Sequence, residues 1–366
     1  MDVARSDSRI DLKPSPNTLA NLPSVISEIQ SLPKVDLHRH LEGSLRLQSM
    51  LEIISAHNLD LPVSESELEP RVQMVAGDAR SVEVFLAKFK IIRQFFRSLE
   101  IIQRIVEEII EDAVSDGVKL LELRFTPAAL RQYSGLTLSE VVDAVIASGQ
   151  SAAATHDLIL GLIVSVNRHE PLKLAEEVVR LAVDRKDQGI LGVDLAGDEQ
   201  AYSSDPFIPL FSEAKQAGLK LTIHAGEWGG PDRVAHAIEV MAADRIGHGV
   251  RCLEDPAVVQ LARAAGVGFE VSLTSNLHTG VFPALEQHPL SEMIEAGLRA
   301  AITTDDPSIF RTTLSAEHMH AIERLGLSLE TIKGLTLQAV QLSFVDAKVK
   351  RKMETRIQES FWGSGV

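Results

Sequence analysis

Eight short apolar runs recur along this 366-residue chain, and they constrain its fold more than any other feature of the sequence. Between most of them lie segments such as Leu172–Arg185 and Asp255–Ala265, in which apolar residues return every three or four positions, as on one face of a helix. A repeated strand–helix–strand pattern predicts parallel pairing of the strands. The expected strands are Val35–Leu37, Lys119–Phe125, Leu158–Val166, Ile190–Leu195, Lys220–Ile223, Arg245–Gly247, Val267–Ser272 and Arg299–Thr303.

Eight such units are the number that closes a (β/α)₈ barrel, so the sequence predicts an α/β fold of the TIM-barrel type. An open, doubly wound sheet shows the same alternation, and the strand count alone does not exclude it. The chain lacks the glycine-rich phosphate loop that would favour that alternative. We expect residues 24–366 to form a single barrel domain after a poorly ordered leader, residues 1–23, whose polar residues follow no period.

The interval 45–117 is too long for one crossover between the first two strands, and it contains several helical patterns. Two of them are Val84–Leu99 and Ile101–Ser115. We interpret the interval as a helical insertion that covers the C-terminal mouth of the barrel, where the active site of such a fold lies. Phe85 and Phe89 in this insertion fit either the wall of a pocket or an ordinary helix core.

Composition excludes several classes of protein. Lys and Arg number 36 against 51 Asp and Glu, and this net charge of −15 argues against a nucleic-acid partner. We find neither a signal peptide nor an apolar run of membrane-spanning length, so we expect a cytoplasmic protein with no membrane association. Cys252 is the single cysteine and is expected to be a small buried apolar residue, so a zinc site would need His and carboxylate ligands. The oligomeric state is left open.

A pair of histidines, His38 and His40, stands at the end of the first expected strand. Alternate residues of a strand point to the same side, so both imidazoles can face the barrel interior and bind one metal ion. His318 and His320 have the same spacing but lie in a helical pattern, where residues two apart point to nearly opposite faces. We therefore predict that only the first pair binds a metal.

Further polar residues follow later strands: His224 and Glu227 after the fifth, His248 after the sixth, and Asp305 and Asp306 after the eighth. In barrels these strand ends carry catalytic residues. Two adjacent carboxylates repel each other unless a cation or a proton relieves them. Three imidazoles and one carboxylate around a water form a typical hydrolytic zinc site, and Glu227 is well placed as a proton carrier beside it.

These residues lie in segments that together resemble the adenosine deaminase family, in the same order over about residues 33–345. The resemblance implies a (β/α)₈ hydrolase with one Zn²⁺ per chain that replaces the 6-amino group of adenosine, or of a related adenine compound, with oxygen. The deaminases that bind zinc through cysteine pairs are excluded, because the chain has one cysteine. The matching segments are residues 33–44 (PKVDLHRHLEGS), 194–199 (DLAGDE), 224–227 (HAGE), 245–250 (RIGHGV), 272–276 (SLTSN) and 304–307 (TDDP).

The same resemblance implies a role for each site residue. Glu227 would protonate the purine N1, His248 would orient and stabilise the attacking hydroxide, and Asp306 would help to position that hydroxide and hydrogen-bond N7. The backbone N–H of Gly197 would meet N3, and Glu42 would contact the ribose end. The implied metal ligands are His38, His40, His224 and Asp305, and the implied substrate-binding set is His40, Glu42, Gly197 and Asp306.

Glu42 departs from the best-known adenosine-specific members, which carry Asp there, and it also resembles relatives that act on adenine or aminodeoxyfutalosine. The segment 275–280 and the phenylalanines Phe85 and Phe89 resemble nucleoside deaminases more closely. Our first prediction is therefore deamination of adenosine or 2′-deoxyadenosine to inosine or 2′-deoxyinosine and ammonia. The alternatives are a deaminase of adenine or aminodeoxyfutalosine, another metal-dependent hydrolase of the same superfamily, and a nucleoside-binding barrel without turnover.

Overall fold

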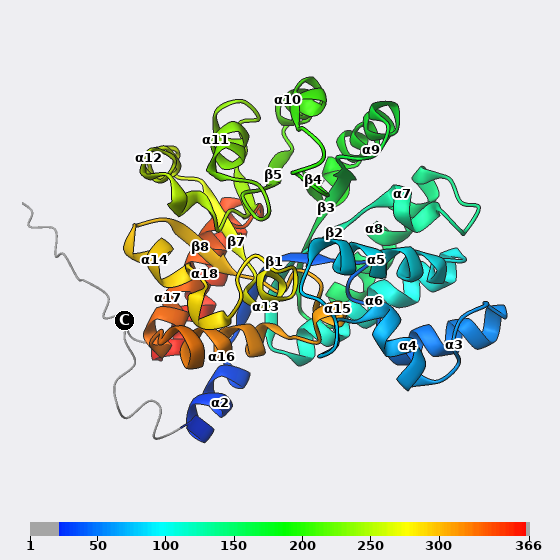
Figure 1. Ribbon diagram of the computed structural model, residues 1–366, viewed down its shortest axis with the longest axis horizontal. Helices are drawn as coiled ribbons and strands as arrows, with labels where there is room; N and C mark the ends of the chain where they lie inside the picture. Colours follow the sequence, from blue (N-terminus) through cyan, green and yellow to red (C-terminus); the bar gives the residue numbers. More distant parts are fainter. Residues whose placement is uncertain (1–21, 364–366) are drawn as a thin grey trace, which may run out of the picture.

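The computed structural model describes residues 22–363 and forms a barrel of eight parallel strands (Figure 1). Each strand pairs with the next one along the chain, from β1 to β8, so the predicted (β/α)₈ class is confirmed. The strands are β1 Lys34–His40, β2 Val118–Phe125, β3 Ile159–Asn167, β4 Ile190–Ala196, β5 Lys220–Ala225, β6 Arg245–His248, β7 Gly268–Val271 and β8 Arg299–Ile302. Most of their residues are buried, as expected for strands covered on both faces, which explains why they read as continuous apolar runs.

The barrel is nearly closed, and the closing contact involves the predicted metal ligands. β8 and β1 meet through a single parallel bridge between Arg39 and Asp305. The Asp305 N–H donates to the His38 carbonyl over 2.7 Å, and the His40 N–H donates to the Asp305 carbonyl over 2.8 Å. The contact that closes the barrel therefore also positions three candidate ligands, His38, His40 and Asp305.

Helices surround the barrel, and in Figure 1 α9 to α12 follow one another around its outside in chain order. The Asp255 side chain begins α12 by accepting the Ala257 N–H, so the expected segment Asp255–Ala265 corresponds to an N-cap and its helix. The helices after β2 are α7 Pro127–Arg131, α8 Leu138–Thr155, α9 Leu172–Asp184, α10 Ile208–Gln216, α11 Pro231–Glu239, α12 Pro256–Ala265, α13 Leu273–His278, α14 Leu290–Glu295, α15 Pro307–Phe310, α16 Leu314–Leu325, α17 Leu329–Leu342 and α18 Ala347–Trp362.

The helices between β1 and β2 divide into two groups. They are α3 Leu47–His57, α4 Glu65–Val72, α5 Val82–Ile92, the 3₁₀ turn η1 Arg93–Phe95 and α6 Leu99–Ser115. α5 and η1 line the cavity at the barrel mouth, as expected. α6 instead packs against β2 and α8, so it serves as an outer barrel helix and does not cover the mouth.

The pattern 84–99 is not one continuous helix, which corrects the sequence-based expectation. The chain leaves helical geometry at Phe96, and the Ser98 side chain then begins α6 by accepting the Ile101 N–H. At the N-terminus, α2 spans Leu22–Ser31, so it starts two residues inside the expected leader. The rest of that leader, residues 1–21, lies outside the described residues.

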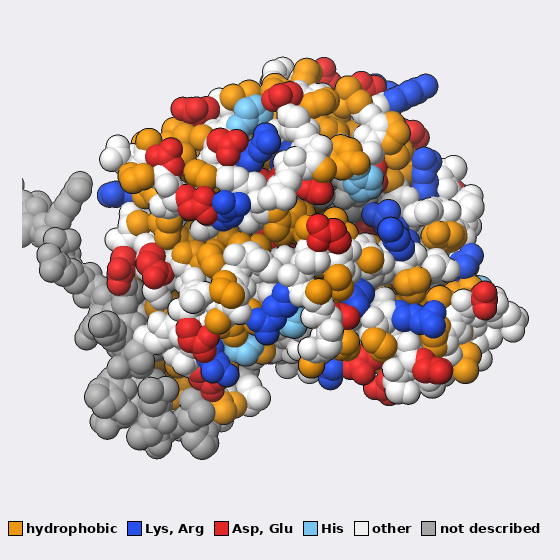
Figure 2. Space-filling view, viewed as in Figure 1, with side chains coloured by type: hydrophobic (Ala, Val, Ile, Leu, Met, Phe, Trp, Pro, Cys, Tyr) orange, Lys and Arg blue, Asp and Glu red, His pale blue; other side chains and the backbone are white. Residues whose placement is uncertain are grey.

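Two predictions from composition can be compared with the structure. Cys252 is fully buried, as expected, and burial raises the pKa of its thiol to about 12. Figure 2 shows Lys and Arg side chains interspersed with Asp and Glu over the visible face. No helix within residues 22–363 is long and apolar enough to cross a membrane.

Candidate active site

The predicted metal ligands converge at the C-terminal ends of β1, β5 and β8. His38 Nε2 lies 3.1 Å from both His40 Nε2 and Asp305 Oδ1, and His40 Nε2 lies 3.3 Å from the same oxygen. The His224 ring stands 4.8 Å from the His38 ring, centroid to centroid. The structure also brings in His248, because ligand atoms of His38, His224, His248 and Asp305 all lie within 4.8 Å of one another.

The chemistry of these donor atoms fits a divalent cation. His38 Nδ1 lies 2.9 Å from Glu270 Oε2, which places the proton of a neutral ring on Nδ1 and leaves a lone pair on Nε2. That lone pair faces the Asp305 carboxylate, an arrangement that is repulsive without a cation between them. Ligand atoms at about 2.0–2.1 Å from a tetrahedral zinc ion lie about 3.3 Å apart, close to the separations observed here.

Two buried carboxylates contact predicted metal ligands at their far ring nitrogens. Glu270 in β7 contacts His38, and Asp194 Oδ1 in β4 lies 2.9 Å from His224 Nδ1. A carboxylate on the far nitrogen of a ligating imidazole fixes its tautomer and strengthens it as a ligand. Glu270 was not predicted from the sequence, and Asp194 lies in the segment 194–199 without a role assigned to it. The sequence signal for both residues is a charged side chain within an otherwise apolar expected strand.

Buried arginines neutralise these carboxylates in the barrel interior. Arg124 Nη2 donates to Glu270 over 2.8 Å and to the Leu37 carbonyl over 2.9 Å. Arg245 also pairs with Glu270, and its other end donates to Glu122 over 2.6 Å. Buried charges require such partners, since an isolated ion would be costly to desolvate. Through Arg124 and Arg245 the network of ion pairs extends from the candidate metal site into the barrel strands.

Two site residues hold left-handed backbone conformations although neither is glycine. Asp305 has φ 62° and His248 has φ 60°. Such conformations cost free energy in L-residues and persist where the surrounding structure enforces them, often at functional sites. For Asp305 the enforcing contacts are the two hydrogen bonds to β1 that close the barrel.

Glu227 combines burial with contact to the cluster. It is 4% exposed, and its Oε2 lies 3.5 Å from His248 Nε2. Burial, together with the nearby charges of Asp305 and Glu199, raises the pKa of Glu227 well above its usual range. The raised pKa favours the protonated carboxyl group, the form that a proton donor to a bound molecule needs.

Asp306 is a second carboxyl group with a raised pKa, caused by burial and by the adjacent Asp305 charge. Its Oδ1 is buried and has no hydrogen-bond partner within residues 22–363. A buried polar atom without a partner is costly, so this atom is suited to meet a ligand. Gly43 leaves the room for it, since a Cβ at Gly43 would lie 1.7 Å from Asp306 Oδ1.

The close approach of Gly43 predicts a strong effect of one methyl group. In Gly43→Ala the Asp306 carboxyl must leave its position, and we expect kcat to fall by about 10²-fold, the cost of misplacing a group at a reacting centre. The matched control is Gly334→Ala in α17, where a Cβ would meet nothing within 4 Å. Steady-state kinetics on both variants checks the prediction, and equal activities would contradict it.

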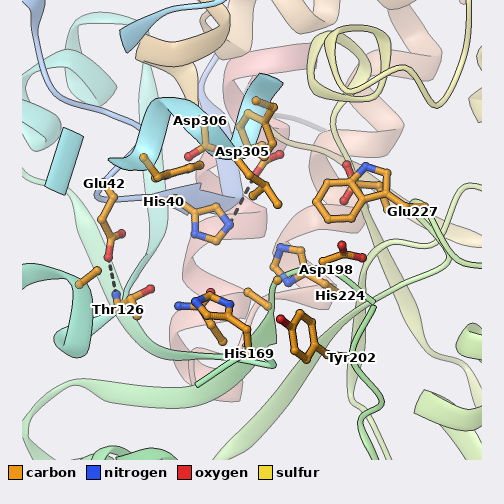
Figure 3. A pocket seen from close by; sticks show the side chains of 18 of the residues that line it. His40, Glu42, Thr126, His169, Asp198, Tyr202, His224, Glu227, Asp305 and Asp306 are labelled. Atoms are coloured by element: carbon orange, nitrogen blue, oxygen red, sulfur yellow. Dashed lines mark hydrogen bonds and ion pairs between the residues drawn. The ribbon is translucent and has the colours of Figure 1, made fainter. Parts of the chain in front are cut away.

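The cluster opens into a cavity of about 330 Å³, within the range of small-molecule sites. Glu42 and Glu227 lie on opposite sides of His40 and His224 in Figure 3. Glu42 Oε1 accepts the Thr126 N–H over 2.8 Å, and burial raises the pKa of Glu42 to about 7. The backbone of Gly197 lines the same cavity, as do Phe85 and Phe89, so those phenylalanines are both packed and pocket-facing.

The loop that carries Glu227 is held by a residue to which sequence reasoning gave no role. Glu199 accepts four consecutive backbone N–H groups, from Gly226 to Gly229, at 2.8–2.9 Å. Glu199 is 2% exposed. Glu199 therefore fixes the backbone that carries Glu227. The sequence signal is its place in segment 194–199, one of the segments that resemble the family.

The short helix α13 supplies contacts to three site residues. Ser275 Oγ donates to Asp305 Oδ2 over 2.7 Å, and Thr279 Oγ1 donates to Glu227 over 3.4 Å. Asn276 Nδ2 lies 3.2 Å from His248 Nδ1. The start of α13 is anchored by Glu317 of α16, whose carboxyl accepts the Thr274 N–H over 3.1 Å.

Glu317 predicts a pH dependence of stability. Burial raises the pKa of Glu317 from 4.5 to about 7, so the folded protein binds the proton more tightly than the unfolded chain. The free energy of unfolding must then fall as the pH rises through this window, by about 3 kcal/mol in full. Glu317→Gln should flatten this part of the Tm-against-pH curve, whereas Glu323→Gln on the exposed face of α16 should keep it. An unchanged slope in Glu317→Gln would contradict the assignment.

The barrel, with its His and Asp cluster at the C-terminal strand ends, defines a metal-dependent hydrolase of the amidohydrolase superfamily. The family model described as adenosine deaminase matches residues 33–360. An adenosine deaminase from Shigella flexneri is 34% identical over 328 residues, which cover 89% of this chain and 98% of the relative. The chain belongs to the adenosine deaminase family.

Two solved structures are also similar to this chain. One is an adenine deaminase from Arthrobacter aurescens, with 25% identity, a TM-score of 0.83 and coverage of 90% of this chain and 98% of that chain. The other is an N6-methyl-AMP deaminase from Arabidopsis thaliana, with 27% identity, a TM-score of 0.80 and coverage of 92% and 99%. Together with the His and Asp cluster that could hold a metal ion, these relatives identify a metal-dependent purine deaminase.

Proposed function

We propose that the protein deaminates adenosine or 2′-deoxyadenosine hydrolytically, with one Zn²⁺ per chain held by His38, His40, His224 and Asp305. The observation that carries the proposal is Glu227, a buried carboxyl group with a raised pKa that lines the same cavity as the His and Asp cluster. When bound, the ion would lower the pKa of a water molecule from its ordinary high value to about 7 and so supply the nucleophile.

The remaining steps belong to side chains of this chain. Glu227 transfers its proton to the purine N1, which makes C6 electrophilic toward the attacking water. Asp306 donates a hydrogen bond to N7 from its protonated carboxyl group, and the Gly197 N–H meets N3. His248 donates to the attacking oxygen. The C6–O bond forms and the C6–N bond breaks. One proton of the water leaves with the amino group as ammonia, and the other restores Glu227, whose own proton stays on N1 of the product.

Glu42 supports a nucleoside rather than a 5′-nucleotide as the substrate. Its carboxyl group is held by Thr126 and lines the part of the cavity that we assign to ribose. There it can accept a ribose hydroxyl, whereas a phosphate would meet a second acid and repel it. Lys90 and Arg93 also line the cavity, and the similar N6-methyl-AMP deaminase makes the nucleotide the test case for this argument.

A substrate panel on one zinc-loaded sample tests the proposal. Adenosine and deoxyadenosine should show the ultraviolet change of deamination, with higher kcat/KM than adenine, aminodeoxyfutalosine or N6-methyl-AMP. Higher kcat/KM for any of the last three would replace the substrate and retain the reaction. Absence of turnover on the whole panel, with zinc bound, would overturn the proposed function.

A further inference from the structure

His288 is a buried histidine outside the cluster, and it lies between the 3₁₀ turn η5 Leu285–Gln287 and α14. The backbone N–H of Leu290 donates to His288 Nδ1 over 3.2 Å. Because a backbone amide can only donate, His288 Nδ1 is unprotonated, and the ring proton stands on Nε2. The main chain therefore determines which ring nitrogen of His288 carries the proton.

Asn276 continues the chain of hydrogen bonds toward the site. His288 Nε2 lies 3.1 Å from Asn276 Oδ1, where its proton meets an acceptor. The carboxamide then presents its NH₂ group to His248 Nδ1 over 3.2 Å. Asn276 is fully buried, so water does not offer the amide an alternative partner.

The relay ends by fixing the tautomer of His248. An NH₂ group only donates, so His248 Nδ1 accepts and carries no proton, and the proton of the ring stands on Nε2. His248 Nε2 points into the site, 3.5 Å from Glu227 Oε2 and 3.8 Å from Asp305 Oδ2. His248 therefore offers the site an N–H donor and cannot remove a proton from an attacking water.

We propose that Asn276 and His288 are positioning residues that hold His248 with its proton on Nε2, through a hydrogen-bond relay that starts at the Leu290 backbone. Its consequence for catalysis rests on the proposed function, in which His248 stabilises the attacking oxygen by donation. The tautomer itself does not depend on that function. Reversing the direction of the hydrogen bonds in the relay would remove the N–H donor at His248 Nε2 and leave the shape of the site unchanged.

Asn276→Asp is the variant that reverses the relay at constant shape. A carboxylate at this position accepts from both rings, so a proton moves onto His248 Nδ1. His288→Gln is the conservative partner, because an amide can still accept from Leu290 and donate to Asn276. Asn58→Asp, at the exposed C-cap of α3, makes the same chemical change away from the site.

The readout is ¹⁵N NMR of the imidazoles in zinc-loaded, histidine-labelled protein, with the His248 signals identified by their loss in His248→Gln. The wild type should show an unprotonated His248 Nδ1 and a protonated Nε2, His288→Gln and Asn58→Asp should keep this pattern, and Asn276→Asp should protonate Nδ1. For Asn276→Asp we expect kcat to fall by at least about 10²-fold, because the variant loses the His248 donor and also the hydrogen bond from Asn276 to Glu227. The NMR pattern of His248 is therefore the readout specific to the relay.

A proton on His248 Nδ1 in the wild type would overturn the proposal without any variant. Unchanged His248 signals together with unchanged kcat in Asn276→Asp would also overturn it. If the tautomer responds as expected while no purine is turned over, the relay stands and the proposed function fails. The two proposals are therefore tested separately.

Discussion

Replacing Glu227 with glutamine is expected to lower kcat by about 10²–10⁴-fold, the contribution of a well-matched general acid. Glutamine has nearly the same shape and can still accept the hydrogen bond from Thr279 Oγ1. It has no acidic proton, however, and cannot protonate a ring nitrogen. Since Glu227 is not among the ligands assigned to the ion, the zinc content should stay at one per chain.

The measurement combines steady-state kinetics with elemental analysis of the same samples. Glu239→Gln, on the exposed end of α11, is the matched control, because it makes the same substitution far from the cavity. Activity of Glu227→Gln near that of the control would show that the proton comes from elsewhere. A loss of zinc in Glu227→Gln would instead show that Glu227 supports the metal site.

The position of the site at the strand ends could be predicted because the relevant residues carry a positional signal. His38 and His40 alternate along β1, and His224, His248 and Asp305 each stand within three residues of the end of a strand. In a barrel all such ends meet at one mouth, so the sequence spacing was sufficient to predict that they gather. No fine geometry was needed for that step.

The supporting carboxylates could not be placed in the same way, because their roles depend on contacts across the barrel. Glu270 reaches His38 from β7, two places around the barrel from β1, and only closure brings these side chains together. Asp194 reaches His224 because the register pairs Asp194 with Thr222, two residues before His224 on the next strand. The hydrophobic pattern of the sequence predicts neither the register of the strands nor the contacts that closure of the barrel makes.

The break between α5 and α6 was missed for a different reason. The apolar spacing continues through the break, and Ser98 alone marks the start of a new helix by capping it. A single capping serine is a weak local signal beside a long periodic one. The same weakness explains why α6 was expected over the barrel mouth instead of outside β2.

Removing the metal is expected to lower activity more than replacing any single proton-carrying residue. Without the ion, water keeps its ordinary high pKa and is almost entirely un-ionised at neutral pH, so chelated protein should have no activity above background. Zn²⁺ alone should restore it. Chelation should also lower Tm, because an ion that binds only the folded state stabilises it by mass action.

The Asp194→Asn variant is expected to weaken metal binding without abolishing it. The variant keeps an oxygen that can accept from His224 Nδ1, but it removes the charge that strengthens His224 as a ligand, so we expect metal affinity to fall by about 10–100-fold. Competition with a zinc chelator measures this, and Asp187→Asn in the exposed turn η2 Lys186–Gln188 is the control. Activity in Asp194→Asn should recover at high Zn²⁺, because the defect lies in holding the ion. If Asp194→Asn stays inactive with zinc bound, Asp194 also acts in the chemical step. In the chelation experiment, full activity of the chelated wild type would show that the metal takes no part in the reaction.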